Sequence, residues 1–365
     1  MTAVRGPTAG RSVLILSRHH PRAASSRLRT YQYIPYLEAM GWSVRASHFF
    51  DEAYLRSLYR SGGRRAGDVA RAYLRRVRAL LSLRQASVVW VEKEVFPFLP
   101  GLAESLLARS GVPYVVDYDD ATFHTYDLHR HAVVRALLGN KLDPLLRGAQ
   151  AVTVGNAYLQ SYARTHGARE VVKIPTVVDI DRYSLRDEPP DQELRIGWIG
   201  TPKTAKYLEQ LYLPLRMAAR NRRLRLVTIG APALGDVGFP VEQHEWSSES
   251  ETGLLASLHM GVMPLPDEPW ERGKCGYKLI QYMACGRPVI ASPVGVNTEI
   301  VTPAVGLLVR TEAEWLSAIE RLAADPVLRA RLGSNGRRRV EAEYALQVTA
   351  PRIEALLRRI ALQHA

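Results

Sequence analysis

Short apolar runs alternate along this chain with longer segments in which apolar residues recur every three or four positions. The runs lack polar alternation, which is typical of strands buried on both faces of a parallel sheet. In the first half, the predicted strands are residues 12–17, 43–47, 88–91, 114–116 and 151–154. Between the first two, Ile34, Leu37 and Met40 share one face of a predicted helix, and a glycine follows as its stop. This alternation predicts parallel βαβ units and an α/β fold.

Residues 187–191 interrupt the pattern with a polar segment that contains two prolines, a composition typical of a linker. The alternation then restarts, with predicted strands at residues 194–199, 224–229, 261–265 and 288–291. We therefore expect two doubly wound, Rossmann-like domains at residues 1–188 and 189–345. Residues 346–365 are expected to form a C-terminal helix that could cross back to the N-terminal domain, with a kink or break at Pro351.

The composition narrows the class of protein. A chain of 365 residues with 47% hydrophobic and 23% charged residues fits two globular domains and excludes disordered and fibrous classes. Two cysteines, Cys275 and Cys285, are too few for a disulfide framework or a paired Cys-x-x-Cys metal site. No run approaches the roughly 18 apolar residues that span a bilayer, and the first residues lack the apolar stretch of a signal peptide. We expect a soluble protein of the reducing cytoplasm.

The charge balance suggests an anionic partner. Lys and Arg total 49 against 36 Asp and Glu, a net charge of +13, which fits a nucleic acid, an acidic membrane surface or a phosphorylated ligand. A generally arginine-rich proteome would give the same balance. Nine arginines lie between Arg56 and Arg84, interleaved with apolar residues. This region is a candidate for peripheral contact with the anionic inner face of the membrane, or an ordinary surface helix whose apolar stripe faces its own core.

Two turns are candidates for binding phosphate, although neither a G-x-G-x-x-G nor a G-x4-G-K-[ST] loop is present. The predicted strand 194–199 ends in Gly200 and Thr201, and Lys203 and Lys206 follow where a helix would begin. A glycine there lets the backbone approach a ligand, and the lysines supply charge. Many strand-to-helix turns share this composition without binding a ligand.

The segment 273–300 has the denser pattern. Its loop contains two glycines, two lysines and the start of a helix, which together make an anion site from free N–H groups and cations. Gly286 would end that helix, the strand 288–291 follows, and Gly295 opens another turn. The candidate ligand-binding residues of this loop and helix are Lys274, Cys275, Gly276, Tyr277, Lys278 and Gln281.

The same segment resembles the donor-binding region of retaining glycosyltransferases of family four, in which a glycine-rich loop leads to a helix ending in a stretch like EAMACGKPVIAS. Here residues 281–292 are QYMACGRPVIAS, and residues 295–301 are GVNTEIV. Further stretches agree in order, namely IGWIGTPKT (196–204), GVMPL (261–265) and IPTVVD (174–179), and a subgroup of the family is similar at SSRLRTYQYIPYLEAMGW (25–42), VEKE (91–94) and DYDDA (117–121). The resemblance covers about residues 12 to 350.

The resemblance implies the GT-B architecture, two Rossmann-like domains facing across a cleft, with a nucleotide-sugar donor on the second domain and the acceptor on the first. The family's two glutamates, separated by seven residues, are replaced here by Gly273 and Gln281. Gln281 can still accept hydrogen bonds from ribose hydroxyls, more weakly than a carboxylate. Gly273 cannot replace the glutamate that usually faces the sugar, for which Glu271 and Glu268 are nearby candidates.

Where the family typically has an arginine after the glycine of the first turn, this chain has Thr201. The resemblance then implies that the lysines bind the diphosphate. In the first half it places the acidic turn 117–120 near the donor sugar, so Asp119 and Asp120 are the candidate catalytic residues, able to orient a sugar hydroxyl or the acceptor. A solvated turn or helix cap is the alternative. The candidate acceptor-side residues are Arg27, Arg29, Lys93 and Glu94, and surface ion pairs are their alternative. We expect His124 to be a surface histidine.

The leading hypothesis is a hexosyltransferase-type enzyme of bacterial polysaccharide biosynthesis. It would transfer a sugar from a nucleotide-diphosphate sugar to a saccharide, lipid-linked glycan or small hydroxyl acceptor, with retention of configuration. Lysines and amides would stabilise the charge on the leaving phosphate, and no metal or other cofactor is expected, since no D-x-D motif follows a strand of the second half. The alternatives are a nucleotide-sugar epimerase, a non-catalytic relative that binds a nucleotide or a partner, and a nucleic-acid binder, which rests on charge alone.

Overall fold

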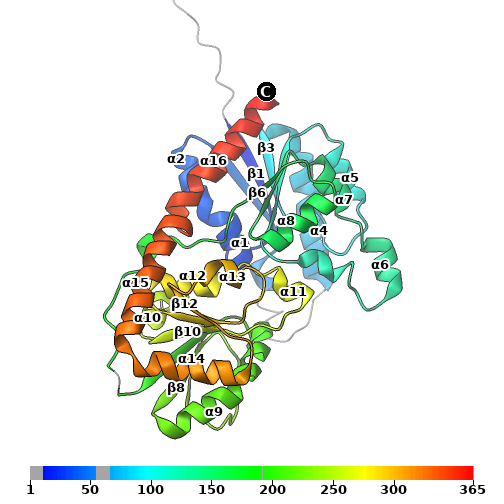
Figure 1. Cartoon of the computed structure of the whole chain (residues 1–365). Coiled ribbons are helices and arrows are strands. Elements are labelled where there is room, and N and C mark those ends of the chain that lie inside the picture. The colour runs from blue at the N-terminus through cyan, green and yellow to red at the C-terminus, as the bar shows by residue number, and fades with distance from the viewer. Residues whose placement is uncertain (1–10, 55–65, 191, 365) are drawn as a thin grey trace, which may run out of the picture. The chain divides into compact units, whose positions relative to one another are not determined.

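Two parallel sheets organise the chain in the computed structural model (Figure 1), which describes residues 11–54, 66–190 and 192–364. The first unit runs up to Pro175 and takes in the chain from Thr349 onward, and the second unit is Thr176–Val348. Each unit contains one six-stranded sheet. The predicted α/β class with two doubly wound sheets is therefore confirmed.

The sheet of the first unit has the strand order β2-β1-β3-β4-β5-β6, and every neighbouring pair is parallel. Its strands are β1 (Ser12–His19), β2 (Ser43–Phe50), β3 (Val88–Glu92), β4 (Tyr114–Tyr118), β5 (Ala151–Val154) and β6 (Val171–Lys173). In the centre, Ile15 pairs with both Ala46 and Trp90. Because chain order reverses direction between β1 and β3, the carboxyl ends of these two strands form the topological switch point at which α/β sheets bind ligands.

Helices of the first unit connect and cover these strands. They are α1 (Ala24–Arg29), η1 (Tyr31–Tyr33), α2 (Ile34–Ala39), α4 (Ala66–Leu81), η2 (Leu83–Gln85), α5 (Leu102–Ala108), η3 (Thr122–Thr125), α6 (Ala132–Leu138), α7 (Asp143–Gly148), α8 (Ala157–Thr165) and α16 (Leu346–Gln363). The predicted helix after β1 is thus a short 3-10 turn followed by α2, and Gly41 (φ +83°) follows it as predicted.

The second sheet has the order β12-β11-β10-β7-β8-β9, again entirely parallel. Its strands are β7 (Leu194–Ile199), β8 (Leu224–Ile229), β9 (Val241–His244), β10 (Met260–Met263), β11 (Val289–Ala291) and β12 (Gly306–Leu308). Trp198, Leu226, Met260 and Ile290 from four strands pack in one buried core with Trp315. The switch point of this sheet lies between β7 and β10.

The helices of the second unit include two that begin at this switch point, η5 after β7 and α12 before β11. The full set is η4 (Ile180–Arg182), η5 (Pro202–Leu211), α9 (Tyr212–Asn221), α10 (Glu251–Ala256), α11 (Pro269–Arg272), α12 (Tyr277–Ala284), α13 (Asn297–Ile300), α14 (Glu312–Ala324) and α15 (Pro326–Glu343). The N-termini of η5 and α12 place the candidate donor-binding residues at one edge of the sheet.

The unit boundary lies before the linker at 187–191 that the sequence suggested. Val178 forms a bridge with Ala345, and its N–H donates to the Tyr344 carbonyl (3.1 Å), so this segment already belongs to the second unit. From Thr349 onward, α16 packs with the first unit, where the Thr349 hydroxyl lies 3.1 Å from that of Tyr33. The expected break at the proline is wrong, because α16 continues through it as one helix.

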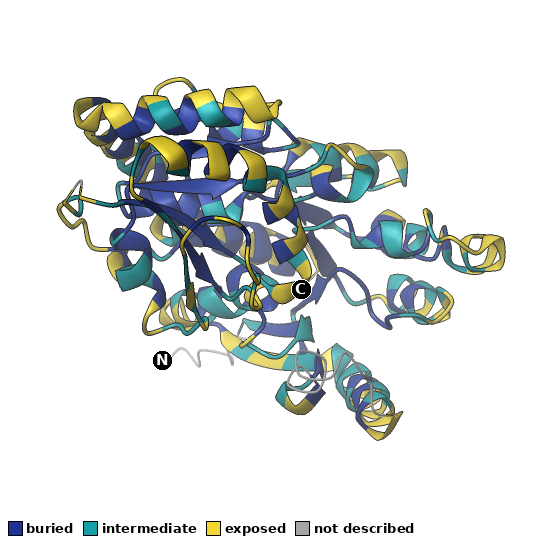
Figure 2. Ribbon diagram, turned by 90° about the horizontal axis from the view of Figure 1, so that it is seen from below, coloured by how far each residue is buried: buried dark blue, intermediate teal, exposed yellow. Residues whose placement is uncertain are grey.

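Helix α4 falls in the arginine-rich region, of which residues 55–65, with Arg56, lie outside the described residues. One face of α4 packs inward, where Ala72 and Arg76 are buried. The other face exposes Leu74, Val77 and Leu81, by 50%, 45% and 82%. Figure 2 colours the ribbon by burial and shows several helices that are buried on one side and exposed on the other. In the part of the chain described here, no helix combines the length and apolar character needed to cross a membrane.

Candidate functional site

The turn after β7 brings a cation against a glycine backbone. The Gly200 N–H donates to the Ile229 carbonyl (2.9 Å), which ties the turn to β8. Thr201 then caps η5 through reciprocal hydrogen bonds with Thr204. A Cβ atom at Gly200 would lie 2.6 Å from Lys278 Nζ, so the lysine can approach this closely because the residue is glycine.

Lys278 lies in the first turn of α12. The preceding Gly276 has a φ of +66°, and a Cβ atom there would clash with Ile300, so this position requires glycine. Lys278 Nζ lies 3.9 Å from the centroid of the Trp198 ring. Burial, and then the neighbouring Lys274, lower the pKa of Lys278 well below its usual value. Among the described residues the ammonium has no ion-pair partner, so an anion bound here would stabilise a charge that the fold leaves uncompensated.

Three further lysines gather over two aromatic rings at the same edge of the sheet. Lys203 Nζ lies 5.6 Å from the Trp270 ring centroid. Lys206 and Lys274 lie 5.3 and 5.9 Å from the Tyr207 ring centroid. Two of these lysines are on η5 and the third is in the loop before α12, whereas α11 contributes the Trp270 ring. Such a group of cations fits a ligand that carries more than one negative charge.

The loop before α12 differs from the family pattern in its carboxylates. Gly273 has no side chain, and of the two nearby glutamates Glu271 is buried and accepts a hydrogen bond from the Tyr207 hydroxyl. Glu268 is the exposed N-cap of α11. Cys275 is buried, with its sulfur 3.9 Å from the Gly273 carbonyl oxygen. Neither Glu271 nor Glu268 is therefore at position 273, where the family pattern has a glutamate.

Gln281 belongs to a buried network that the sequence did not reveal. Its amide donates to the Tyr183 hydroxyl (3.3 Å), which donates to Glu251 (2.9 Å). The Trp246 indole N–H donates to the other oxygen of Glu251 (2.5 Å). Burial, followed by the neighbouring Tyr277 and Glu251, raises the pKa of Tyr183 well above its usual value. The carboxylate of this region is thus on α10, thirty residues before the amide, and no spacing rule points to it.

In the first unit, a strained turn follows β3. The Glu94 N–H donates to the Glu92 carbonyl (2.8 Å), and Lys93 between them has a φ of +67°, a conformation that costs a non-glycine residue about 1–3 kcal/mol. The turn directs the buried Lys93 Nζ to Asp119 (2.9 Å) and the Ser25 hydroxyl (2.7 Å). Burial lowers the pKa of Lys93, but the Asp119 and Glu92 carboxylates outweigh it and the pKa is raised.

The two candidate catalytic carboxylates have different surroundings. Burial favours the neutral form of Asp119, but Lys93 and then Arg29 outweigh it, so the pKa of Asp119 lies below its usual value. Its side chain keeps 11% exposure. Asp120 accepts a hydrogen bond from the Ala121 N–H (3.0 Å) within its own turn. Asp119 is therefore the ionised carboxylate at the switch point of the first sheet.

Three of the four candidate acceptor-side residues, Arg29, Lys93 and Glu94, are buried in the fold. Arg29 is 2% exposed, and its guanidinium donates to both oxygens of Asp117 (2.6 and 2.9 Å) and to the Ile174 carbonyl (2.8 Å). The Thr153 hydroxyl also donates to Asp117 (2.5 Å). Arg27, two residues earlier on α1, is half-buried. The structure thus separates two arginines that look equivalent in sequence.

Glu94 is also buried and joins distant segments. It pairs with Arg18, and one of its oxygens accepts from Lys141 Nζ and from the Tyr126 hydroxyl, both at 2.7 Å. Burial raises its pKa, but the two cations outweigh it and the pKa of Glu94 is lowered. The carboxylate therefore ties the end of β3 to the segments on either side of α6.

Sequence reasoning overlooked His19, at the end of β1. Its ring stacks on Phe50 with the centroids 5.4 Å apart, and Nδ1 is buried without a hydrogen-bond partner among the described residues. Burial, then Arg18 and Lys93, lower the pKa of His19 well below its usual value, so the imidazole is neutral. Its position at the carboxyl end of a central strand could have identified it.

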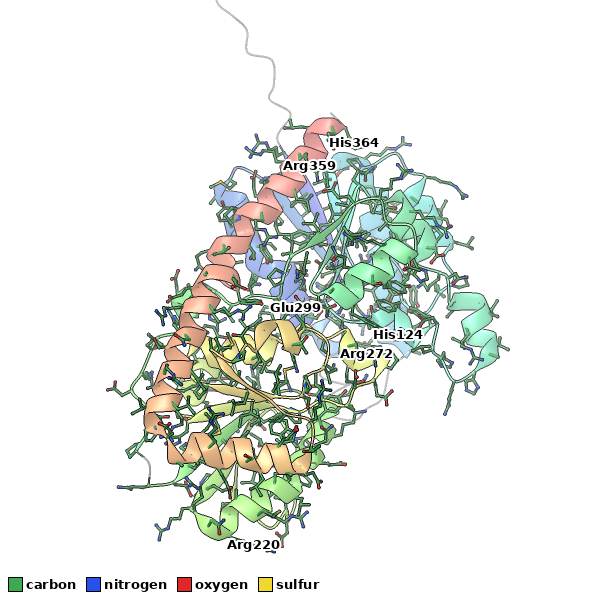
Figure 3. The ribbon with its side chains drawn as sticks, viewed as in Figure 1. His124, Arg220, Arg272, Glu299, Arg359 and His364 are labelled. Atoms are coloured by element: carbon green, nitrogen blue, oxygen red, sulfur yellow. The ribbon has the colours of Figure 1, made fainter. Side chains whose placement is uncertain are left out.

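The expectation that His124 is a surface histidine is wrong. Its side chain is 10% exposed, with Nδ1 2.8 Å from Asp127 and Nε2 2.7 Å from the Tyr158 hydroxyl (Figure 3). Both ring nitrogens are thus engaged within the first unit.

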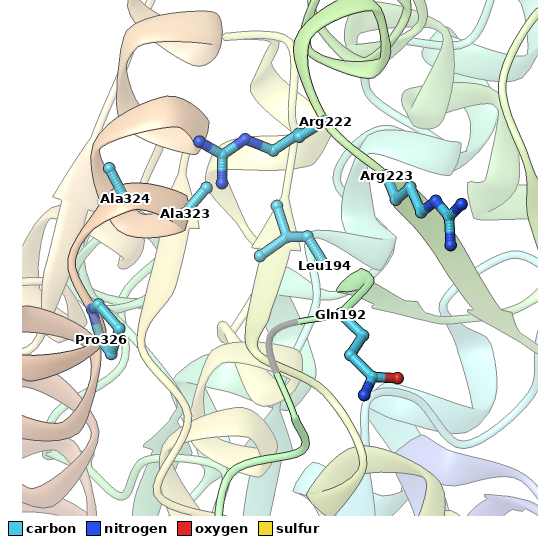
Figure 4. A pocket seen from close by; sticks show the side chains of 7 residues that line it. All are labelled: Gln192, Leu194, Arg222, Arg223, Ala323, Ala324 and Pro326. Atoms are coloured by element: carbon cyan, nitrogen blue, oxygen red, sulfur yellow. The ribbon is translucent and has the colours of Figure 1, made fainter.

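A separate cavity of about 200 Å³ opens at the amino ends of β7 and β8, the opposite edge of the sheet from the lysines (Figure 4). It is lined by Gln192, Leu194, Arg222, Arg223, Ala323, Ala324 and Pro326. In Figure 4, Arg222 points toward α14, whereas Arg223 points away from it. None of the candidate site residues lines this cavity.

Two parallel six-stranded sheets are the core of the GT-B architecture, and solved structures of that architecture match nearly the whole chain. Sucrose-phosphate synthase from Thermosynechococcus elongatus matches over 96% of this chain and 98% of its own, with 19% identity and a TM-score of 0.74. HepE from Anabaena, solved in complex with UDP-glucose, matches over 95% and 99%, with 14% identity and a TM-score of 0.67. The fold of this chain is therefore GT-B.

Residues 194–325 match the family of glycosyl transferases group 1, so the second unit contains a domain of that family. A GDP-mannose-dependent monoacylated alpha-(1-6)-phosphatidylinositol monomannoside mannosyltransferase from Corynebacterium glutamicum is 39% identical over 84 residues. That stretch covers 22% of this chain, and this chain spans about a fifth (22%) of the relative.

Proposed function

We propose that this protein is a glycosyltransferase that transfers a sugar from a nucleotide-diphosphate sugar to a hydroxyl acceptor. The observation that carries the proposal is Lys278, an ammonium without an ion-pair partner among the described residues, held against Gly200 at the start of α12. A diphosphate fits this position and the lysines beside it. The group 1 domain of the second unit and the UDP-glucose in HepE support such a donor.

The chemistry follows from the charge that develops. When the bond between the sugar and the diphosphate breaks, negative charge grows on the leaving phosphate and positive charge on the sugar ring. Lys278 and Lys274 stabilise the phosphate charge without reorganising, because the fold already holds them at the sheet edge. We further propose that these lysines act in place of a metal ion, so that activity survives EDTA. The resemblance to family four supports retention of configuration, with the leaving phosphate taking the acceptor proton.

We assign the acceptor to the first unit. Asp119, ionised and fixed by Lys93, is the group proposed to accept a hydrogen bond from the attacking hydroxyl. The Corynebacterium relative is named for a phosphatidylinositol mannoside, which supports a lipid-linked glycan among the candidate acceptors. A soluble saccharide and a small hydroxyl compound remain the alternatives to test.

We also propose that the protein works in the cytoplasm, at the inner face of the membrane. Exposed Leu74, Val77 and Leu81 on α4, with Arg71 and Arg78 beside them, support contact with anionic lipid. Flotation with vesicles tests this contact. Binding that ignores lipid charge and salt would contradict it.

A second candidate function is a non-catalytic relative that binds a nucleotide or a partner. Gly273 and Gln281, which replace the paired glutamates, favour it, because the carboxylate expected to face the sugar is missing. Such a protein would bind donor without consuming it.

The test is a screen of UDP-, GDP-, ADP-, CDP- and dTDP-hexoses by thermal shift, followed by donor hydrolysis. A ligand at about 100 times its Kd stabilises the folded state by about 2.7 kcal/mol. Lys278→Ala should strongly reduce that shift, whereas Arg220→Ala, on the exposed end of α9 (Figure 3), should leave it unchanged. Binding without hydrolysis would favour the non-catalytic candidate, and binding of none of these donors would refute the glycosyltransferase and a relative that binds a nucleotide.

A further inference from the structure

Helix α6 differs from the other described α-helices of the first unit, because it contains no buried residue. A surface helix normally turns one apolar stripe toward the core and its polar face toward water. No residue of α6 is buried, although six of its seven residues are apolar. Val133 and Leu137 are 69% and 66% exposed, and Leu128 just before the helix is 56% exposed. The structure therefore presents an apolar helix in which Val134 and Leu138 are half-buried and the other apolar side chains are exposed.

Helix α6 is part of a lobe, residues 127–140, and the residues that flank the lobe on both sides bind the Glu94 carboxylate. The Tyr126 hydroxyl and Lys141 Nζ both donate to the same oxygen of Glu94 at 2.7 Å. Lys141 also donates to the Phe96 carbonyl (2.6 Å) and lies 3.4 Å from Glu104. These contacts are buried, so they fix the base of the lobe while residues 127–140 project from it. Figure 1 shows α6 standing apart from the other helices of its unit.

The charged side chains that follow Asp127 in this lobe are basic, and the Asp127 carboxylate itself lies 2.8 Å from His124 Nδ1. Residues 128–142 contain no aspartate or glutamate, and the exposed cations there are Arg130 and Arg135. Arg135 Nη1 donates to the His129 carbonyl (2.6 Å), so its guanidinium stays close to the lobe. Apolar side chains flanked by arginines suit the boundary of an anionic bilayer, where lipid tails receive the apolar groups and phosphates receive the cations.

We propose that the lobe of residues 127–140 is a membrane-docking element that inserts Val133 and Leu137 into the headgroup region of an anionic phospholipid bilayer. The proposal concerns a different element from α4 and rests on a different observation, the apolar helix without a buried residue. It does not depend on glycosyl transfer, because the lobe can be tested without a donor sugar.

The experiment uses the full chain and sedimentation with vesicles of phosphatidylcholine, with and without phosphatidylglycerol. Wild type should bind the anionic vesicles, and Val133→Ser with Leu137→Ser should lower the partition coefficient about tenfold or more. The matched control is Val327→Ser with Leu362→Ser, a valine and a leucine that are 79% and 67% exposed on α15 and α16. The control should bind as wild type does.

A second measurement reports insertion directly. Leu137→Cys can be labelled with an environment-sensitive dye, because the native thiols Cys275 and Cys285 are buried. Its emission should shift to the blue with anionic vesicles and not with phosphatidylcholine alone. Arg130→Gln should weaken binding about fivefold, an effect that added salt removes.

The proposal is overturned if the serine pair binds vesicles as tightly as wild type, or if wild type ignores phosphatidylglycerol. Loss of binding in Leu81→Ser together with unchanged binding of the serine pair would assign the membrane contact to α4 alone and overturn the proposal. A second copy of the chain could pack against α6 in place of a membrane. Sedimentation without lipid tests this, because a wild-type dimer that the serine pair dissociates would also refute membrane docking. Thermal unfolding verifies that each variant is folded, as expected for substitutions at exposed positions.

Discussion

Lys278 gives the sharpest quantitative test of the donor site, through the variants Lys278→Met and Lys278→Arg. Methionine keeps the stem over the Trp198 ring and removes the charge, whereas arginine keeps a charge that does not titrate below pH 12. A hydrogen bond to a charged group contributes about 1.5–3 kcal/mol, so methionine should weaken binding of a nucleoside diphosphate about 10- to 100-fold.

The pH dependence follows from the lowered pKa of Lys278. In the free protein the ammonium loses its proton at a lower pH than an ordinary lysine, because burial and then Lys274 disfavour the charged form. A bound diphosphate favours that form and raises the pKa again. Affinity should therefore be greatest below the pKa of the free protein and fall as the pH rises through it, with protons taken up on binding in that range.

Titration calorimetry in buffers of different ionisation enthalpy measures this proton uptake. Wild type should show it, and both variants should lack the contribution of residue 278, with Lys278→Arg retaining most of the affinity. The reasoning is refuted if Lys278→Met binds as tightly as wild type, or if its proton uptake matches that of wild type. Arg220→Ala is the control, because its side chain is exposed on α9.

Four further predictions concern the rest of the fold and site. Asp117→Ala leaves a buried guanidinium without its carboxylate and should lower the free energy of unfolding in urea by about 3–5 kcal/mol; a loss under 1 kcal/mol would contradict the assigned pair. Asp119→Asn should lower the rate of transfer while leaving the donor Kd unchanged, and an equal change in both would argue against its acceptor role. Because Lys93 lowers the pKa of Asp119, Lys93→Met should move the acidic limb of the rate profile to higher pH, and an unmoved limb would exclude that coupling. Gly276→Ala should reduce both donor affinity and melting temperature, since its Cβ meets Ile300 at positive φ; an unchanged thermal transition would show that the loop adapts.

The strands that sequence predicted best are those with long apolar runs and clear ends. β7 and β8 have the predicted bounds, Leu194–Ile199 and Leu224–Ile229, because each is buried along almost its whole length. The short strands β6, β9 and β12 were missed. Their residues are mostly half-exposed or exposed, so they lack the continuous apolar run that signals a central strand.

The candidate site was predictable where function follows from a local pattern. A glycine, a helix start and a lysine lie within three residues at Gly276–Lys278, and the structure places them together. Sequence could not show that Arg29 is buried and Arg27 is not, because the difference depends on which side of α1 faces Asp117. Nor could it connect Gln281 with Glu251, since tertiary packing alone brings α10 and α12 together.

Because α16 belongs mostly to the first unit, it determines the order in which the two units can be completed during synthesis. The second unit is one continuous stretch of chain, Thr176–Val348, and all of it has been made before the ribosome reaches Thr349. The first unit still lacks Ile353, Leu357 and Ile360, which are at most 2% exposed in the finished fold. The unit that is synthesised first can therefore be completed only last, and until then the residues that bury these three side chains lack their packing partners.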